Sequence, residues 1–541
     1  MIERDTRNSL PVKSVTRRGF VQGAAAMGLA GAALGRQTRS LDVVFAAQGT
    51  PDTGEEIPQG GAFTAGHQTS ILSMDPAATG EPQVRTIRNC VTEALFDLDP
   101  DANLIPRLAE SWEQTDDKTY VLQLRQGVKF HDGNPFDAEV VKFNLERMLN
   151  PETQNVWASE IAQLESVDVI DTYTVQLKTK ALLAAFLIPL YDMNGMQLSP
   201  AAVEEWGADI GFHPVGTGPF RFVEFIKDQH VVLERNPDYW QPGKPYLDQL
   251  TFNAIPVDST RLTDLRSGGI QLAEYLPFQD IARLRDSQEI IVSERPGFRV
   301  DYLNFNVTRS PGSSKEFRQA WNWLIDRDAF MQGSYFGTGA PAWDLFLPGT
   351  RFYDPEYRPT QRDVGKAKEL LAASGVQLPI DLTMYVTQDP VVQRDAQITQ
   401  ANVAEAGINL AIEVVDQARY NEIHQPRPDG SAGDFDLQLS WWGFRPDPDQ
   451  YLGVILKTNG SWNWGKYSNP EFDKLLVAEQ GELDDAKRIA VFRQIAELLT
   501  EDAPVIPYHF GANVKGLTPN VAGFVHRADG LVRYVDIGLR Q

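Results

Sequence analysis

The chain has a single cysteine among its 541 residues and few basic residues for its length. One cysteine excludes an internal disulfide framework and any zinc or iron–sulfur site built from clustered cysteines. Fifty Lys and Arg against 73 Asp and Glu give a net charge of −23. Nucleic acids and anionic membranes are bound through a basic face, so neither is expected to be the main partner.

Long hydrophobic runs and enzyme motifs are also missing. The apolar stretch at residues 23–35 is rich in Ala and Gly, and it is shorter than the roughly 20 residues that span a membrane. The sequence contains no G-x-S-x-G elbow and no H-E-x-x-H zinc motif, and its seven histidines are scattered. We therefore predict no catalytic residue, no metal site and no cofactor.

Two segments come close to catalytic or nucleotide-binding patterns. Residues 460–467 nearly match the phosphate-binding loop G-x4-G-K-[ST], but Tyr467 cannot supply the small hydroxyl that ligates magnesium. His131 and Asp132 could act as a base and its orienting carboxylate. Neighbouring side chains in a strand-to-turn segment point to different sides, however, so a structural hairpin is predicted there.

The N-terminus carries an export pattern. Arg17 and Arg18 precede the weakly hydrophobic stretch, which is the twin-arginine arrangement. We predict a signal region over residues 1–47 and a flexible tether, rich in Gly and Pro, over 48–61. No cysteine follows the apolar stretch within the signal region, since Cys90 lies well inside the mature chain. A lipid-anchored lipoprotein is therefore not expected, and the protein is expected to work outside the cytoplasm.

Length and local patterns indicate a multidomain α/β protein. A chain of 541 residues is too long for one core. Asp137 can cap a helix that ends before Asn150 and Pro151, because proline disfavours helix in the residue before it. Further helices are predicted around residues 317–324, 363–374 and 489–499, and strands over 120–124, 434–439 and 505–510. Short strands alternating with helices favour mixed sheets.

Eight short segments follow one another across nearly the whole mature chain, at residues 108–112, 119–133, 214–220, 235–240, 303–306, 317–320, 441–443 and 467–473. Each segment alone is weakly specific. Together, in this order, they resemble the family 5 extracellular solute-binding proteins, the dipeptide, oligopeptide and nickel-chelate binders of ABC importers.

The resemblance implies a two-lobed periplasmic-binding-protein fold of type II, in its three-subdomain variant, with mixed sheets and a hinge. Lobe 1 is expected over residues 62–300, with an inserted subdomain at about 78–213. Lobe 2 is expected over 301–507, and residues 508–541 return to lobe 1.

The resemblance also implies a function without catalysis. The protein is expected to capture a small solute between its lobes by hinge closure and to deliver it to the membrane permease of an ABC transporter. We expect a monomer with hinge segments near Arg299–Leu303 and Val505–Tyr508. An exported hydrolase acting on peptide or glycan is the alternative, because carboxylates paired in space cannot be recognised from sequence.

The predicted ligand site centres on the segment from Trp441 to Tyr451, interpreted as a Pro- and Asp-rich cleft rim. Ligand pockets favour rigid aromatic walls with a few directed polar groups. In relatives, the residue corresponding to Trp442 lines the ligand cavity. The full set of candidate ligand contacts is Trp442, Trp441, Phe444, Arg445, Asp447, His67, Gln68, Thr69, Asn306 and Trp464.

Arg445 is where the chain departs from its peptide-binding relatives, which commonly place an acidic residue there to receive a peptide α-ammonium. An arginine would favour a carboxylate, phosphate or hydroxyl-rich ligand instead. Two alternatives stay open: Arg445 could pair with Asp447 or Asp449 on the rim, or Asp447 could receive the ammonium. The sequence does not choose among peptide, sugar, opine and chelate ligands.

Overall fold

The fold is described from a computed structural model. The structure describes every residue except 1–55, 70, 79–81, 288, 444 and 541. The predicted signal region, most of the tether and the candidate residue Phe444 thus lie outside the described residues. Within the described part of the chain, no helix has the length and apolar character that crossing a bilayer requires.

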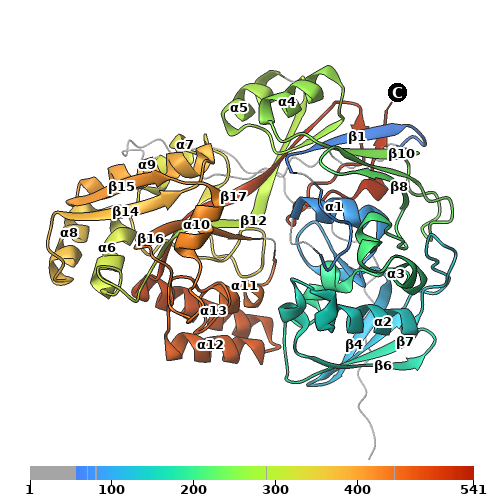
Figure 1. The fold of residues 1–541 in the computed structure, drawn as a ribbon, viewed down its shortest axis with the longest axis horizontal. Coiled ribbons are helices and arrows are strands. Elements are labelled where there is room, and N and C mark those ends of the chain that lie inside the picture. Colours follow the sequence, from blue (N-terminus) through green and yellow to red (C-terminus); the bar gives the residue numbers. More distant parts are fainter. Residues whose placement is uncertain (1–55, 70, 79–81, 288, 444, 541) are drawn as a thin grey trace, which may run out of the picture. The chain divides into compact units, whose positions relative to one another are not determined.

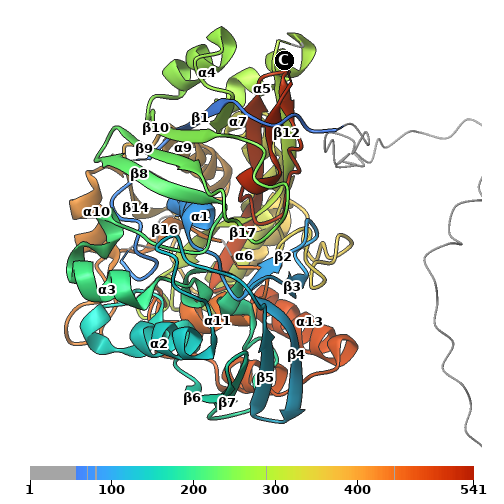
Figure 2. The same ribbon diagram turned by 90° about the vertical axis from the view of Figure 1, so that its right-hand side faces the viewer.

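The largest feature is a nine-stranded mixed sheet (Figures 1 and 2). Its strand order is β16-β12-β17-β11-β1-β10-β9-β8, and β13 also pairs with β17. Strand β1 runs parallel to β10 and β11, whereas the other neighbours are antiparallel. The strands are β1 (Ala62–His67), β8 (Phe220–Ile226), β9 (His230–Arg235), β10 (Gln249–Ala254), β11 (Leu272–Glu274), β12 (Ile291–Phe305), β13 (Ala340–Pro341), β16 (Leu437–Gly443) and β17 (Val505–Leu517).

Strands β12 and β17 are the longest and connect the two halves of this sheet. The predicted lobe boundaries at residues 300/301 and 507/508 fall inside them, and these boundaries stay predictions. Pairing between the two strands is irregular at two places. Gly297–Arg299 face Gly511 without regular pairing, and Tyr508 is skipped between paired neighbours. Both irregularities lie at or beside the predicted hinge segments.

Four smaller sheets accompany the large one. An antiparallel sheet of order β4-β5-β7-β6, packed against helix α2, forms most of the region predicted as the inserted subdomain (Figure 2). A parallel pair, β14 and β15, packs against helix α9. The strands are β2 (Phe96–Leu98), β3 (Leu104–Pro106), β4 (Ala109–Asp116), β5 (Thr119–Leu124), β6 (Leu164–Asp171), β7 (Thr174–Thr179), β14 (Ile380–Val386), β15 (Ile408–Val414), β18 (Val521–Ala522) and β19 (Gly538–Leu539).

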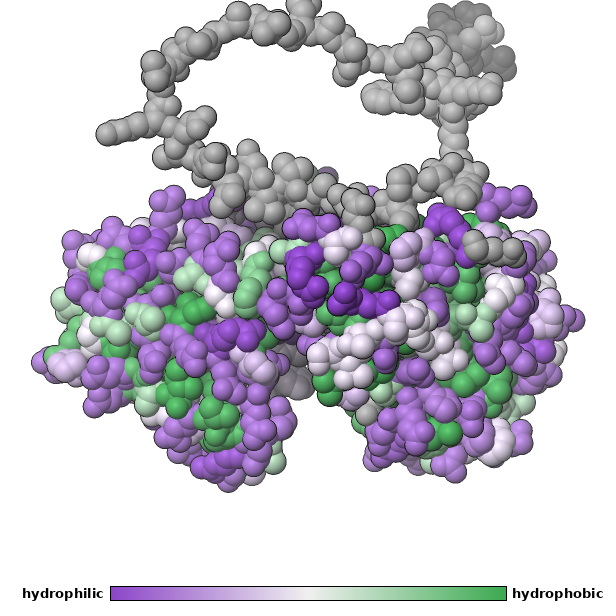
Figure 3. Space-filling view, turned by 90° about the horizontal axis from the view of Figure 1, so that it is seen from above, coloured by the Kyte–Doolittle hydropathy of each residue, from purple (hydrophilic) through white to green (hydrophobic). Residues whose placement is uncertain are grey.

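Helices cover these sheets and leave a largely hydrophilic surface in the view of Figure 3. Six short 3-10 turns, η1 to η6, complete the described elements. The helices are α1 (Pro82–Val91), α2 (Ala138–Leu149), α3 (Pro200–Trp206), α4 (Asp258–Ser267), α5 (Phe278–Ser287), α6 (Lys315–Leu324), α7 (Arg327–Gly333), α8 (Val364–Ala373), α9 (Pro390–Ala404), α10 (Gln417–His424), α11 (Asp449–Ile455), α12 (Pro470–Gln480) and α13 (Asp485–Asp502).

Local sequence signals account for several of these elements. Asp137 caps α2 by accepting a hydrogen bond from the backbone N–H of Val140, as its position in the sequence predicts. The predicted helices near 317, 363 and 489 are α6, α8 and α13. The strand predicted over 434–439 is wrong at both ends, because β16 spans Leu437–Gly443. Pairing with β12 extends it, so Trp441 and Trp442 are strand residues rather than loop residues.

Candidate functional site

Two adjoining cavities, of about 370 and 530 Å³, form a cleft in the molecule. They share seven lining residues, which come from the ends of β1 and β11, from β12, β16 and β17, and from the start of α9. These residues are Gln68, Tyr275, Arg299, Asp389, Trp441, Gly511 and Ala512. Both predicted lobes therefore contribute walls, and the combined space is large enough for a small polar solute.

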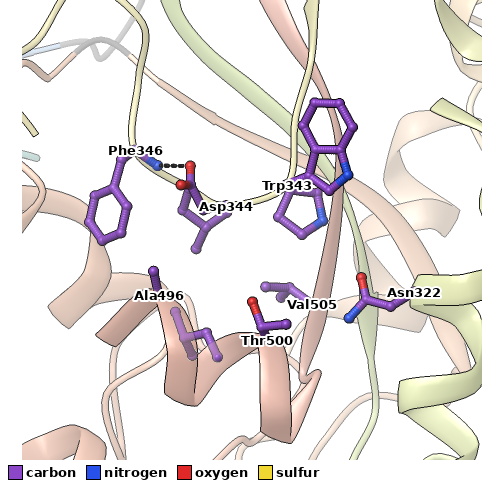
Figure 4. A pocket seen from close by; sticks show the side chains of 10 residues that line it. Asn322, Trp343, Asp344, Phe346, Ala496, Thr500 and Val505 are labelled. Atoms are coloured by element: carbon purple, nitrogen blue, oxygen red, sulfur yellow. Dashed lines mark hydrogen bonds between the residues drawn. The ribbon is translucent and has the colours of Figure 1, made fainter. Parts of the chain in front are cut away.

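A third cavity is too small for a solute. It measures about 10 Å³, which is room for about one water molecule. Figure 4 shows Asp344 among its lining side chains, accepting a hydrogen bond from the backbone N–H of Phe346 at 2.9 Å. Burial raises the pKa of Asp344 to about 7. This cavity is a feature of the protein interior rather than a binding site.

Trp441 and Trp442 point to opposite faces of β16, as successive residues in a strand do. Trp441 is 44% exposed and lines both cavities of the cleft, and the Arg299 guanidinium lies over its ring at 4.7 Å. Trp442 is absent from the lining of both cavities. Its ring instead meets Trp462 edge-on, and Trp462 stacks on Trp464. Trp441, rather than Trp442, therefore faces the cleft.

The Arg445 side chain is buried and already paired with two carboxylates of the chain. Its guanidinium contacts Glu160 at 2.7 Å and Asp192 at 2.6 Å, and it lies over the Trp157 ring. Burial by itself would lower the pKa of Arg445, but the two carboxylates outweigh it and raise the pKa. The predicted pairing with Asp447 or Asp449 is therefore wrong, because its partners come from residues 78–213.

Asp447 is held by a different cation. Both of its carboxylate oxygens accept hydrogen bonds from Arg488, at 2.6 and 2.7 Å, and Arg488 also contacts Glu479. Asp447 is 2% exposed and Arg488 is 1% exposed. Neither Arg445 nor Asp447 lines the cleft cavities, so a direct ligand contact at either residue would require these ion pairs to open.

The remaining candidates divide between the cleft and the interior. Gln68 and Thr69, which the family resemblance suggests as ligand contacts, line the cleft, and their contact with a ligand stays a prediction. His67 points the other way and is buried edge-on against Phe252, where burial lowers the pKa of its ring. Asn306 is buried and donates hydrogen bonds to the carbonyls of Gly433 and Phe435. The cleft therefore gathers Trp441, Gln68 and Thr69 among the described candidates.

The most polar part of the cleft was not predicted as a ligand site. Arg299 donates from Nε and Nη2 to Oδ1 of Asp301 at 2.9 and 2.7 Å. His509 Nδ1 contacts Oδ2 of the same carboxylate at 2.8 Å, and its ring stacks on Tyr335. Burial would raise the pKa of Asp301, but Arg299 and His509 outweigh it and lower the pKa. All four side chains line the larger cavity.

A signal for these residues is present in the sequence. Charged side chains at Arg299, Asp301, His509 and Lys515 interrupt long strands that are otherwise largely apolar. A charged group in a buried strand needs a partner, so such interruptions indicate residues that meet in space. Lys515 meets Glu274 at 3.1 Å in the wall of the smaller cavity.

His131 and Asp132 do not act on one another as a base and its orienting carboxylate would. They bond separately, His131 to the carbonyl of Gly218, and Asp132 by accepting from the hydroxyl of Ser199. An antiparallel bridge between Lys129 and Pro135 forms the predicted hairpin. Across the described ranges, no three His, Cys, Asp or Glu side chains gather to hold a metal ion. The absence of a cofactor stays a prediction.

Known families and proteins resemble this chain over most of its length. Residues 103–463 match the family model described as bacterial extracellular solute-binding proteins, family 5 Middle. A glutathione-binding protein GsiB from Pectobacterium atrosepticum is 29% identical over 480 residues, covering 87% of this chain and 93% of that protein. The GsiB of Salmonella typhimurium is 28% identical over 462 residues, covering 84% and 90%.

Solved structures are similar along almost their whole length. The periplasmic binding protein DppA of Helicobacter pylori, in complex with the peptide STSA, superposes with a TM-score of 0.77 at 25% identity, covering 90% of this chain and 99% of that one. The substrate-binding protein CtaP of Listeria monocytogenes gives a TM-score of 0.80 at 23% identity, covering 89% and 100%. At 23% identity, the similarity to CtaP supports a shared fold and nothing further.

Proposed function

Because the chain belongs to the family 5 bacterial extracellular solute-binding proteins, we propose that it captures a small peptide-like solute in the cleft and delivers it to an ABC transporter permease. It is an extracytoplasmic substrate-binding protein with the two-lobed fold of this family. Peptide-like chemistry is favoured because the curated relatives named above are glutathione-binding proteins and DppA is in complex with a tetrapeptide. We propose no catalytic activity, so the hydrolase alternative is dropped.

The observation that carries this proposal is the cleft itself. Its walls join Gln68 and Tyr275, from the predicted lobe 1, with Asp389 and Trp441, from the predicted lobe 2. Strand β16 ends the strand order of the large sheet and pairs only with β12 there. An extended peptide backbone can add to the edge of such a strand, while neighbouring pockets select its side chains. A peptide-like ligand beside Trp441 fits this arrangement.

Capture by hinge closure is part of the proposal. Ligand contacts to both walls would favour a closed form, and the irregular pairing at Gly297–Arg299 and Tyr508 offers places where β12 and β17 can change direction. Shifting a mostly open protein to a mostly closed one takes about 5 kcal/mol of differential binding. We further propose a monomer, which gel filtration with light scattering tests directly.

Export through the twin-arginine pathway, without a cysteine-linked lipid, completes the proposal. The arginines concerned lie outside the described residues, so their role rests on the sequence pattern alone. Replacing both Arg17 and Arg18 by Lys should retain the protein in the cytoplasm of an expressing cell. Unchanged export of that variant would contradict the twin-arginine assignment and leave the binding function untouched.

Calorimetry and thermal unfolding with glutathione and small tripeptides test the binding function. At least one of these probes should raise the melting temperature, since a ligand that binds only the folded state stabilises it. Trp441→Ala should weaken binding by up to about tenfold, the range of one lost aromatic contact. The matched control is Trp462→Ala, because Trp462 is 51% exposed and does not line either cavity.

Two outcomes would count against this account. If none of the probes changes the melting temperature, the peptide-like ligand is wrong. If Trp462→Ala weakens binding and Trp441→Ala does not, the ligand lies on the Trp442 face of β16 instead of in the cleft.

A further inference from the structure

The Arg299 guanidinium stands where the two cavities of the cleft meet. Its side chain is 41% exposed and lines both cavities. The central carbon of the guanidinium lies over the Trp441 ring, 4.7 Å from its centroid, and this contact restricts the position of the side chain. Arg299 is therefore both accessible from the cleft and fixed in place.

The bonds to Asp301 leave part of this guanidinium unused. Asp301 accepts from Nε and Nη2 through one oxygen, Oδ1. Among the described residues, no group accepts a hydrogen bond from Nη1 of Arg299. An arginine carries five N–H donors in a rigid fork, and carboxylates match that fork. The unused donors can therefore reach a ligand anion in the cleft.

The second oxygen of Asp301 is also occupied, by His509. His509 Nδ1 lies 2.8 Å from Oδ2 of Asp301, and Nε2 lies 3.1 Å from the carbonyl oxygen of Thr338. Both ring nitrogens thus face acceptor oxygens, and these two contacts fix the ring beside the carboxylate that holds Arg299.

The other charged groups favour the smaller cavity as the place for the anion. There Glu274 is paired with Lys515 at 3.1 Å, and Asp529 is paired with Arg533 at 2.8 Å. Besides Asp301, the wall of the larger cavity holds three carboxylates, of which one, Asp389, also lines the smaller cavity. Within the described part of the chain, none of the three is paired with a cation that lines the cleft. Carboxylates there repel an anion, so Arg299 should receive it from the side of the smaller cavity. The three are Asp258, Asp389 and Asp395.

We propose that Arg299, held by Asp301, His509 and Trp441, is a carboxylate-binding subsite that selects ligands with a free carboxylate. This rests on the proposed function, because it names the ligand group that the cleft recognises. It moves the anion-binding role from Arg445, whose guanidinium is paired with Glu160 and Asp192, to a cation that the cleft exposes.

Calorimetry with the tripeptide Ala-Ala-Ala and its C-terminal amide tests the subsite. The wild-type protein should bind the free acid at least about tenfold more tightly, as expected for one charge-assisted bond. Arg299→Gln should weaken binding of the acid by a similar factor and leave the amide nearly unchanged, which removes the discrimination. Arg299→Lys should retain part of it, because the charge remains and the fork is lost.

Arg309→Gln is the matched control. Arg309 has a similar exposed fraction, 43%, and is paired with Asp434 and Asp436 away from the cleft. This variant should bind both probes as the wild type does. Circular dichroism and the melting temperature of each variant separate loss of the subsite from loss of the fold.

Each outcome decides a different point. Equal affinity for acid and amide in the wild type, or full discrimination in a folded Arg299→Gln, would overturn the subsite and leave the proposed function standing. Binding of neither tripeptide, nor of glutathione, would overturn the peptide-like ligand and this inference with it.

Discussion

Two buried networks of ion pairs meet at residues 445–447, and they attach this segment to different parts of the molecule. Arg445 bonds to Glu160 and Asp192, which lie 285 and 253 residues away in the region predicted as an insertion in lobe 1. Asp447, only two residues further on, bonds to Arg488 on α13, within the predicted lobe 2. The first network therefore connects two regions, whereas the second fastens the segment to its own region.

The two networks are expected to have different roles: one stabilises the fold of a single region, and the other attaches two regions to each other. Removing one member of a buried ion pair greatly lowers the free energy of unfolding, because the other member stays buried without a partner. Removing Arg488 should therefore affect the folding of one region. Removing Arg445 should instead weaken the attachment between regions, since Asp192 keeps a second partner in Arg85 at 2.7 Å.

The largest effect is expected for Arg488→Leu. This change leaves the carboxylates of Asp447 and Glu479 buried without their cation, which should lower the free energy of unfolding by about 3–5 kcal/mol. Urea denaturation followed by circular dichroism measures it. The control is Arg493→Leu on the same helix, because Arg493 is 65% exposed and its pair with Asp354 should contribute under about 1 kcal/mol. Equal losses in the two variants would show that burial does not decide the cost.

In the part of the chain that the structure describes, Asp344 is a buried carboxylate without a countercharge, and it can be compared with the paired carboxylates of the two networks. Burial raises the pKa of Asp344 to about 7, and no ion pair with it is found among the described residues. A folded-state pKa above the unfolded value means that the stabilising contribution is complete below about pH 4 and is lost as the pH rises through 7. Asp344→Asn should therefore be more stable than the wild type at pH 8, by about 2–4 kcal/mol at most, and similar at pH 4.5.

Thermal unfolding at the two pH values measures this difference. Asparagine keeps the oxygen that accepts from the N–H of Phe346, so the variant tests the charge and not the hydrogen bond. A pH dependence of stability that is the same in both proteins would contradict the raised pKa.

A smaller effect on stability is expected for Arg445→Met. We expect a loss of about 1–2 kcal/mol, because Glu160 can take up a proton and Asp192 retains Arg85. Burial already raises the pKa of Glu160 above its usual range. Hydrogen exchange should increase at residues 157–161 and 192–195 and stay unchanged in α13. Faster exchange in α13 would show that this network, too, serves the folding of lobe 2.

The sequence predicts the elements whose causes are local. Asp137 and Asp363 cap α2 and α8 through contacts three residues away, and the apolar stripe of α13 needs only its own periodicity. The family fold also follows from short motifs that occur in order. These predictions succeed because each depends on neighbours within a few residues.

The site was predicted only in part, because its geometry depends on distant partners. The register of β16 against β12 decides whether Trp441 or Trp442 faces the cleft. A shift of one residue in this register would turn the other tryptophan to the cleft. The partners of Arg445 lie more than 250 residues away, so no local pattern reveals them. Arg299 and His509 were visible as charged residues in buried strands, but only strand pairing brings them together.

Closure of the cleft on its ligand is the central claim, and a distance measurement between the two regions tests it most directly. Spin labels at Lys118→Cys, in the β4–β5 turn, and Lys474→Cys, on α12, would report this distance, while Cys90 is buried and should stay unlabelled. Saturation with a tripeptide that calorimetry shows to bind should shorten and narrow the distance distribution. An unchanged distribution with ligand bound would contradict hinge closure.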